Sequence, residues 1–366
     1  MISVTVVVFV LVLAALVFGA CGSPANASVV DKHVVVYYEP GRFVQGVANR
    51  GIWSWGNEIM VGASGGAYLY KGPSVHGIDR SQPRQELQGR SLDGGETWSV
   101  ERPIDEGSID FFSQAVDCPG DMDFTHPDFA LNLLLNESGD GPPRFYYSYD
   151  RGRTWKGPFK LPSFDTPGVL AARTSYLVNG KRDCMLFVTV PGATGKGGRP
   201  LCARTVDGGK TWEFVSFIGA GPEASGIMPV AVRLSESEIL AAVRSRGISS
   251  YLSRDNGGTW EHVNDPVGDA GQQGNPPALI RLNDGRLCLT YGVRSEPYRM
   301  CAKLSSDRGR TWSDEFVLRD DAANWQVGYS RSAQRPDGKV VTAYYIIDPK
   351  LGPEPCVAAT IWDPGK

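Results

Sequence analysis

The octapeptide SLDGGETW (residues 91–98) decides the fold of this chain, because the sequence repeats its pattern four more times. Every copy has the form Ser/Thr-x-Asp-x-Gly-x-Thr-Trp, and successive aspartates are 57, 57, 48 and 52 residues apart. A repeat of this length indicates that one supersecondary unit is used many times. The other copies are SYDRGRTW (148–155), TVDGGKTW (205–212), SRDNGGTW (253–260) and SSDRGRTW (305–312).

The composition of the octapeptide is typical of a tight turn between two strands. Its Asp side chain can accept hydrogen bonds from backbone N–H groups of its own turn, and its Gly supplies a positive φ. The Ser and Thr hydroxyls can satisfy further backbone groups, and the Trp ring is expected to pack beneath the loop. The copies carry no cluster of carboxylates, so we interpret them as structural turns and not as catalytic or metal sites.

The flanks of each octapeptide predict short antiparallel strands. In the clearest copy, NPPALIRL (275–282) and RLCLTYGV (286–293) are separated by Asn-Asp-Gly, and RMCAKLS (299–305) leads into the turn. Short runs rich in Val, Ile, Leu and Tyr between turn residues are typical of strands. Six copies of about four strands predict an all-β fold, a single six-bladed β-propeller over residues 28–366. The segment 33–40, a strand without an octapeptide, is expected to be the outer strand of the last blade.

The N-terminus resembles an export signal. Residues 4–20 are apolar and uncharged, so residues 1–27 are expected to be a signal peptide or lipoprotein signal and the domain to be exported. Ala25-Asn26-Ala27 fits the rule for an ordinary signal peptidase, whereas Phe18-Gly19-Ala20-Cys21 resembles a lipoprotein signal that would attach a lipidated Cys21 to a membrane. An uncleaved anchor is the third interpretation, although the run is slightly short to span a bilayer.

Composition excludes few functions. The net charge is −3 over 366 residues, which gives no reason to expect nucleic acid as a partner. No Cys or His spacing is typical of a metal site, so neither a metal nor another cofactor is expected. Cys184 with Cys202, and Cys288 with Cys301, fall on neighbouring predicted strands; cross-strand disulfides and buried thiols are both compatible with this placement.

Polar residues gather where the inner strands are predicted to start, around one mouth of the propeller. Arginines around a common axis repel each other and are costly to desolvate unless an anion joins them. Their planar guanidinium groups suit a carboxylate, so the sequence predicts a pocket for an acidic sugar or a similar anion. The candidate binding residues are Arg42, Arg50, His126, Asp128, Arg173, Arg244, Asn275, Arg294 and Arg331.

With these octapeptides on six blades, the chain resembles the sialidase superfamily over roughly residues 33–362. The resemblance implies three arginines that hold the carboxylate of sialic acid, a Tyr nucleophile paired with a Glu, and an Asp as acid/base. Tyr329 in GYSRSAQRPDG resembles the nucleophile. Asp79, about a dozen residues before the first octapeptide, resembles the acid/base residue.

The remaining family positions match in different degrees. Arg244 resembles the second arginine of the family, and Arg294 or Arg299 resembles the third. The FRIP motif that carries the first arginine is absent, so Arg42 or Arg50 takes that role. Met228 occupies the expected place of the Glu, and Glu223, five residues earlier, is the candidate substitute.

These residues predict an exported, retaining exo-glycosidase that removes a terminal acidic sugar, sialic acid first, from sialylated or other acidic glycans. A neutral phenol avoids the repulsion that a carboxylate nucleophile would meet beside the substrate carboxylate, and sialidases are the known exception to the two-carboxylate rule. A base must then take the phenol proton, since the ordinary pKa of Tyr is ~10.

Two alternatives remain open at this stage. His126 and Asp128 with Tyr329 suit a uronate lyase or another acidic-glycan hydrolase, with His or Tyr as the proton carrier. The missing FRIP motif and the missing Glu favour a non-catalytic propeller that binds glycans.

Overall fold

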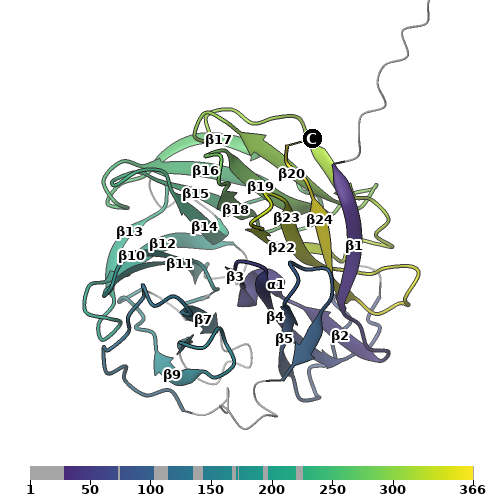
Figure 1. Ribbon diagram of the computed structural model, residues 1–366, viewed down its shortest axis with the longest axis horizontal. Helices are drawn as coiled ribbons and strands as arrows, with labels where there is room; N and C mark the ends of the chain where they lie inside the picture. Colours follow the sequence, from purple (N-terminus) through teal and green to yellow (C-terminus); the bar gives the residue numbers. More distant parts are fainter. Residues whose placement is uncertain are drawn as a thin grey trace, which may run out of the picture.

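The computed structural model describes residues 29–72, 75–102, 114–134, 143–166, 170–171, 173–192, 197–219 and 226–365. The expected signal segment 1–27 and the candidate base Glu223 lie outside these residues. The described chain forms six antiparallel sheets around a central axis, so the predicted six-bladed β-propeller is confirmed (Figure 1).

Each blade follows the chain from an inner to an outer strand. Blade one also carries a short helix, α1 (Val47–Arg50), and an added strand, β2 (Arg42–Gln45), which pairs with the second half of β4. The strands of the first three blades are β3 (Ile52–Trp55), β4 (Glu58–Ala67), β5 (Gln85–Ser91) and β6 (Ser99–Glu101); β7 (Ala130–Leu134), β8 (Arg144–Ser148) and β9 (Lys156–Lys160); and β10 (Tyr176–Gly180), β11 (Asp183–Pro191), β12 (Gly198–Thr205) and β13 (Glu213–Phe217).

The last three blades have four strands each, and the N-terminal strand closes the ring. β1 (Val30–Tyr37) pairs antiparallel with β24, which confirms that the N-terminal strand is the outer strand of blade six, although it begins and ends three residues before the predicted segment 33–40; Figure 1 shows the two strands side by side. The other strands are β14 (Ile227–Arg233), β15 (Ile239–Arg244), β16 (Ile248–Ser253) and β17 (Glu261–Val267); β18 (Ala278–Arg281), β19 (Leu287–Val293), β20 (Arg299–Ser305) and β21 (Phe316–Arg319); and β22 (Val327–Gln334), β23 (Val340–Ile346) and β24 (Cys356–Trp362).

Blade two departs from the prediction of about four strands. Its described part has three, and the segment 114–129 before β7 contains no strand. Val116 forms an isolated bridge with Phe159 of the outer strand β9, and the N–H of Phe124 donates to the carbonyl of Lys181 in blade three. This segment therefore crosses blade two from its outer edge toward blade three and does not begin an inner strand.

The octapeptides form the turns that their composition predicts. In the third copy, Asp207 accepts hydrogen bonds from the Thr211 N–H (3.0 Å) and hydroxyl (2.6 Å), and the Thr205 hydroxyl accepts from the Gly209 N–H (2.9 Å). The other four copies repeat this pattern, and Trp212 is buried beneath its turn. The structural interpretation of the repeat is therefore confirmed.

Loss of the Asp207 carboxylate should destabilise the fold. Burial alone would raise the pKa of Asp207, but the hydrogen bonds from Thr211 and Thr205 outweigh it and lower the pKa to about 2. We expect Asp207→Ala to reduce the free energy of unfolding by about 1–2 kcal/mol, because turn N–H and hydroxyl groups lose their acceptor. Asp207→Asn, which keeps one acceptor oxygen, should cost less. Urea unfolding of both variants near neutral pH measures the difference.

The pH dependence of this contribution has a definite sign. A carboxyl whose pKa is lower in the folded than in the unfolded protein stabilises the fold above its unfolded pKa of ~3.9. That stability is lost as the pH falls through the folded value of about 2. The wild type should therefore lose its advantage over Asp207→Asn in this acidic range. Equal stability of Asp207→Ala and the wild type near neutral pH would show that the carboxylate contributes nothing.

The described residues also give information on the cysteines and on possible membrane-spanning helices. The six cysteines from Cys118 to Cys356 are free and buried, which fits the interpretation as buried thiols. Within the described ranges, no helix is long and apolar enough to cross a membrane.

Candidate functional site

Strand register defines two faces of the propeller. In blade four, Ile239 pairs with Ser253, where the octapeptide begins, and Arg244 pairs with Ile248 at the opposite end. Blade five repeats this order, and Arg294 directly follows β19 at the end away from the octapeptide. We call the face opposite the octapeptides the mouth; Arg244 and Arg294 both reach it.

Tyr329 lies at the mouth near the start of the inner strand of blade six, in a strained backbone conformation. Its φ is 52°, in the left-handed region that non-glycine residues rarely adopt. The N–H of Tyr329 donates to Asn275 Oδ1 at 2.9 Å, and Asn275 Nδ2 donates to the Val327 carbonyl at 2.8 Å. Asn275 is fully buried, and a Cβ on Gly328 would overlap its side chain. The predicted binding residue Asn275 therefore positions Tyr329.

Side chains from three other elements meet the Tyr329 phenol. Arg244 Nη1 is 3.2 Å from the Tyr329 hydroxyl oxygen, and the Arg294 guanidinium lies 5.2 Å from the ring centroid. The ring of Tyr345, on β23, contacts the Tyr329 ring edge to face at 5.6 Å. The structure thus brings together three of the residues that the sequence proposed, from blades four, five and six.

The arginines change the acidity of Tyr329. Burial by itself raises the pKa of a phenol, but the charges of Arg244, Arg294 and Arg173 outweigh burial and lower the pKa of Tyr329 to about 8. Tyr345 behaves oppositely, because burial dominates and raises its pKa to about 12. Two phenols in contact therefore have clearly different acidities.

Arg244 and Arg294 are held by neutral groups. Arg244 donates from Nη2 and Nε to the Gln273 carbonyl, at 2.8 and 3.3 Å. Arg294 donates from Nη2 to the Tyr345 hydroxyl (2.5 Å) and from Nε to the Val327 carbonyl (3.2 Å), and it stacks on Trp325. These bonds fix both guanidinium groups in place without neutralising their charge.

Arg50 is the first-arginine candidate that reaches this region. It is buried and forms a bidentate ion pair with Glu86, at 2.5 and 2.7 Å. Burial and the charges of Arg50 and Arg244 lower the pKa of Arg173 to about 10, although Tyr329 acts in the opposite direction. Burial and the charge of Arg50 also lower the pKa of Arg84 to about 10. The charges of Arg50 and Arg244 therefore both act on Arg173, although Glu86 balances the charge of Arg50.

Asp79 lies at the mouth end of blade one, in the loop between β4 and β5. Its N–H donates to the carbonyl of Ala67, the last residue of β4. Asp79 Oδ1 accepts hydrogen bonds from the Ser81 hydroxyl (2.7 Å) and N–H (2.9 Å), which lower its pKa. None of the described contacts of Asp79 joins it to Tyr329.

Arg331 serves the framework of the propeller. Its Nη2 donates to the carbonyls of Ala48 (2.7 Å) and Thr174 (2.9 Å), and its Nη1 donates to the carbonyl of Pro277 (3.3 Å). These carbonyls precede the inner strands of blades one, three and five. The expectation that Arg331 binds substrate is therefore corrected: its described bonds are all to backbone, and they tie three blades together.

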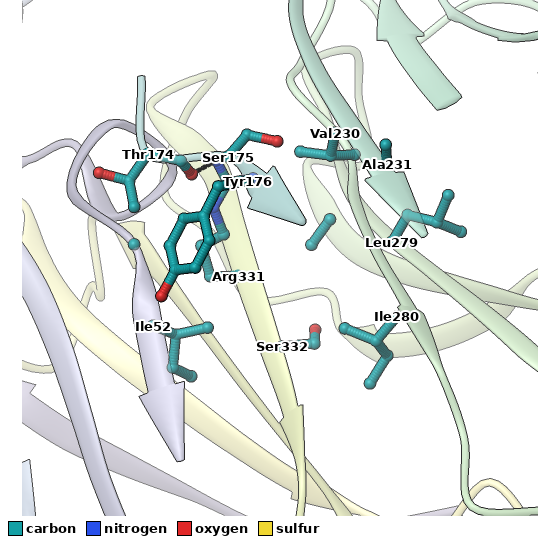
Figure 2. Close-up of a pocket in the computed structure, with 12 residues that line it drawn as sticks. Ile52, Thr174, Ser175, Tyr176, Val230, Ala231, Leu279, Ile280, Arg331 and Ser332 are labelled. Carbon is teal, nitrogen blue, oxygen red and sulfur yellow. Dashed lines mark hydrogen bonds between the residues drawn. The ribbon is translucent and has the colours of Figure 1, made fainter. Parts of the chain in front are cut away.

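A cavity of about 210 Å³ lies beside Arg331 on the axis. In Figure 2, Ile52, Tyr176 and Arg331 stand on one side and Val230, Leu279 and Ile280 on the other. The Tyr176 hydroxyl already accepts from Trp53 Nε1, and the Ser332 hydroxyl bonds with those of Thr290 and Thr342. The residues that line the cavity lie in or just before the inner strands of five blades, and they do not include Tyr329, Arg244 or Arg294.

His126 and Asp128, the predicted binding residues of blade two, lie on the octapeptide face and not at the mouth. Asp128 pairs with Arg151, inside the second octapeptide, at 2.6 Å, and the His126 ring packs on Tyr149 at 4.7 Å. The placement of His126 and Asp128 in the pocket was therefore wrong, because the segment 114–129 runs past blade two and does not start at the mouth.

Arg42 and Arg299, the alternative candidates for the first and third arginine, have other partners than Tyr329. Arg299 forms an ion pair with Glu315 of blade five at 2.9 Å, so Arg294 and not Arg299 contacts Tyr329. Arg42 lies on β2 and donates to Gln85 at 2.9 Å. The described contacts of Arg42 and Arg299 do not reach Tyr329.

His76 and its neighbours are residues that the sequence did not single out. The loop between β4 and β5 carries His76 to blade six, where its Nδ1 is 3.2 Å from Gln326 Oε1 and its ring lies 4.8 Å from Trp325. Burial, helped by the charge of Arg294, lowers the pKa of His76 to about 4, so the imidazole is neutral near neutral pH. The position of His76 three residues before the candidate catalytic residue Asp79 is the sequence feature that could have identified it.

The described residues contain no group of three His, Cys, Asp or Glu side chains that could hold a metal ion. The side chains described at the mouth include phenols, guanidinium groups, an imidazole and the half-buried Asp79. Such a set can bind an anion and carry out nucleophilic or proton-transfer steps.

Comparison with known proteins agrees with this architecture. The profile of the family described as "BNR repeat-like domain" matches residues 136–342. No curated protein matches the chain. Among solved structures, a protein of unknown function from Dyadobacter fermentans has a TM-score of 0.70 at 19% identity, over 91% of this chain and 98% of that one.

Two sialidase structures share the fold. The Trypanosoma rangeli sialidase in complex with sialic acid has a TM-score of 0.56 at 13% identity, over 91% of this chain and 59% of that one. The NanB sialidase of Streptococcus pneumoniae has a TM-score of 0.58 at 12% identity, over 91% of this chain and 70% of that one. At these identities the likeness shows the fold alone. The chain belongs to the BNR repeat-like domain family.

Proposed function

We propose that this protein is a retaining glycoside hydrolase of the sialidase type that removes a terminal acidic sugar, with sialic acid as the first candidate. One observation carries the proposal: Tyr329 is held in a strained backbone conformation near the start of β22, with Arg244 3.2 Å from its hydroxyl and Arg294 beside its ring. The trypanosomal structure of the same fold is a complex with sialic acid, which supports that sugar as the first to test.

The residues at the mouth have distinct roles in this proposal. The substrate carboxylate would approach Arg173, Arg244 and Arg294, whose charges act on Tyr329. Tyr329 Oη, once it has lost its proton to solvent, would attack the anomeric carbon and form a glycosyl–tyrosine bond while the bond to the leaving oxygen breaks. Asp79 would protonate that oxygen and then take a proton from the water that releases the sugar, so two displacements give net retention.

Asp79 offers a selective test of this mechanism. With the purified full chain, Asp79→Asn should reduce hydrolysis of a natural sialyl-oligosaccharide by about 10²–10⁴-fold, since a poor leaving group needs a proton. Hydrolysis of a 4-methylumbelliferyl sialoside should fall much less, because that leaving group departs without one. Asp207→Asn, at an octapeptide turn on the other face, is the matched control and should leave both rates unchanged.

The results of these assays distinguish a sialidase-type hydrolase from a non-catalytic glycan-binding propeller. Release of sialic acid by the wild type, with unequal losses in Asp79→Asn, supports the proposal. Tight sugar binding without turnover of any sialoside or uronide would replace it with a non-catalytic glycan-binding propeller. Equal losses on both substrates would remove Asp79 from the acid role.

A uronate lyase is the second candidate, and a specific observation favours it. The described neighbours of the Tyr329 phenol are arginines and a tyrosine, and the neutral His76 lies beside Tyr345 at 6.2 Å. Such a set can neutralise a uronate carboxylate and move a proton. With His126 on the octapeptide face, His76 replaces it in this alternative. An unsaturated product that absorbs in the near ultraviolet would establish the lyase; its absence across uronate polymers would exclude those substrates.

Export belongs to the same proposal and is supported by the apolar run at residues 4–20. Attachment through Cys21, ordinary signal cleavage and an uncleaved anchor remain the three forms to distinguish. Incorporation of a labelled fatty acid into the chain would establish the lipid-anchored form, an unlabelled, shortened chain would establish cleavage, and an unlabelled, full-length chain would establish the uncleaved anchor.

A further inference from the structure

The position beside Tyr329 that a carboxylate holds in sialidases contains a thioether in this chain. Arg244 Nη1 lies 3.2 Å from the Tyr329 oxygen and 3.5 Å from the sulfur of Met228. Met228 is buried and has a φ of 55°, close to the 52° of Tyr329. A thioether is a weak acceptor and cannot take a phenol proton, so Met228 cannot replace a base.

Arg244 is placed to stabilise the ionised form of Tyr329, which a base would otherwise produce by removing the phenol proton. A guanidinium has donors and no acceptor, so the Tyr329 oxygen must accept the hydrogen bond from Arg244. Protein groups hold Arg244 in this position, since its Nη2 and Nε donate to the Gln273 carbonyl. The phenol is fixed too, because Asn275 holds the Tyr329 N–H. Both partners are therefore preorganised.

The neighbouring phenol shows that this arrangement is specific to Tyr329. Tyr345 also accepts from an arginine, Arg294 Nη2, at 2.5 Å, and yet its pKa is raised to about 12. Tyr329 has Arg244 at its oxygen, Arg294 over its ring and the charge of Arg173 nearby, and its pKa falls to about 8. Several cations around one phenol favour its ionised form.

We propose that Tyr329 is activated by the guanidinium of Arg244 and not by a carboxylate base: Arg244 pairs with the Tyr329 oxygen and stabilises its phenolate form, and Met228 stands in the place of the family's Glu. This inference deepens the proposed function, since it concerns the same nucleophile, but the resting state does not depend on which sugar is bound. Arg244 is a positioning residue here, because it acts through Tyr329.

The first step of the reaction begins with the ionised Tyr329 phenol. Tyr329 loses its proton to solvent before substrate binds. A lone pair on its oxygen then forms the bond to the anomeric carbon, the glycosidic bond breaks, and the departing oxygen takes the proton of Asp79. The substrate carboxylate meets a phenolate that Arg244 already pairs, so the repulsion is reduced. In a lyase the same oxygen would instead accept a carbon-bound proton.

Titration of Tyr329 without substrate tests the inference. Carbon-13 labelling of the tyrosine ring resolves phenol and phenolate by NMR, and Tyr329→Phe identifies the signal among the 14 tyrosines. We expect that signal to titrate near pH 8. Arg244→Met should raise its midpoint by about one pH unit or more, and Arg244→Lys, which keeps the charge, should raise it less. Arg299→Met removes an arginine paired with Glu315 and is the matched control, with no shift expected.

A second pair of variants keeps the test valid if Arg244→Met fails to fold. Met228→Glu leaves Arg244 in place and adds a negative charge beside the phenol, so it should raise the midpoint, whereas Met228→Leu should not. Glu223→Gln examines the carboxylate that lies outside the described residues, and no shift is expected. A Tyr329 signal that stays protonated up to pH ~10 would overturn the proposal. So would a midpoint that moves in Glu223→Gln but not in the Arg244 variants.

Failure of this inference is distinguishable from failure of the proposed function. The titration reports the resting phenol and needs no turnover. A low midpoint that depends on Arg244, in a protein that cleaves no sialoside, would remove the sialidase activity and keep the activated tyrosine. Sialoside hydrolysis by a chain whose Tyr329 titrates near its ordinary value would do the reverse.

Discussion

Replacing Tyr329 with phenylalanine is expected to lower kcat for sialoside hydrolysis by about 10³-fold or more, because the attacking oxygen is removed. KM should change little, since the ring remains in contact with Tyr345 and beside Arg294. The melting temperature should also stay close to the wild-type value, because the backbone bond from Tyr329 to Asn275 does not involve the hydroxyl. Steady-state kinetics together with thermal unfolding measure both effects.

Tyr345→Phe is the control for this loss. It removes the hydroxyl of the adjacent phenol, which accepts from Arg294 at 2.5 Å, and leaves Tyr329 and Arg244 in place. We expect a reduction in kcat of about tenfold or less, since the lost group acts on Arg294 and not on the reacting carbon. Full activity in Tyr329→Phe would remove Tyr329 as nucleophile, and similar losses in both variants would indicate a general disturbance of the mouth.

The largest expected effect on stability is at Arg331. Arg331→Met removes three hydrogen bonds and leaves the carbonyls of Ala48, Thr174 and Pro277 without this donor. An unsatisfied buried carbonyl costs about 1–3 kcal/mol. Water in the adjacent cavity of about 210 Å³ can satisfy part of that loss. We therefore expect the free energy of unfolding to fall by about 3 kcal/mol, measured by urea unfolding.

Arg310→Met is the matched control for Arg331, because Arg310 is exposed within the last octapeptide. It should change the free energy of unfolding by no more than about 0.5 kcal/mol. Arg331→Lys should recover part of the loss, since an ammonium group can donate to some of the same carbonyls. Equal stability of Arg331→Met and Arg310→Met would show that the tie between blades one, three and five contributes nothing.

Sequence reasoning succeeded for residues whose role follows from their own neighbours in the chain. The turn chemistry of Asp207 and Thr211 is complete within one octapeptide, so the pattern predicted both the turn and its hydrogen bonds. Even spacing of these turns then predicted the blades. Tyr329 was identified because its segment resembles a family motif, and the structure places it beside Arg244 and Arg294.

Residues whose position depends on the path of the chain between motifs could not be predicted from the sequence. His126 and Asp128 look like the start of an inner strand, but the segment before β7 runs past blade two to blade three. Arg294 and Arg299 are separated by a single turn, and only their position on either side of it decides which one faces Tyr329. His76 escaped notice because its partners, Gln326 and Trp325, are about 250 residues away.

The sequence by itself determined the repeating scaffold, because a tight turn is specified by hydrogen bonds among residues four or fewer positions apart, such as that from Thr211 to Asp207. Only the tertiary structure decided which polar side chains converge. Arg244 and Tyr329 are 85 positions apart, and Arg331 and Ala48 are 283 apart. Ring closure brings such residues to one axis, and whether a guanidinium there bonds to backbone carbonyls or stays beside a phenol depends on packing between blades, which no local pattern encodes.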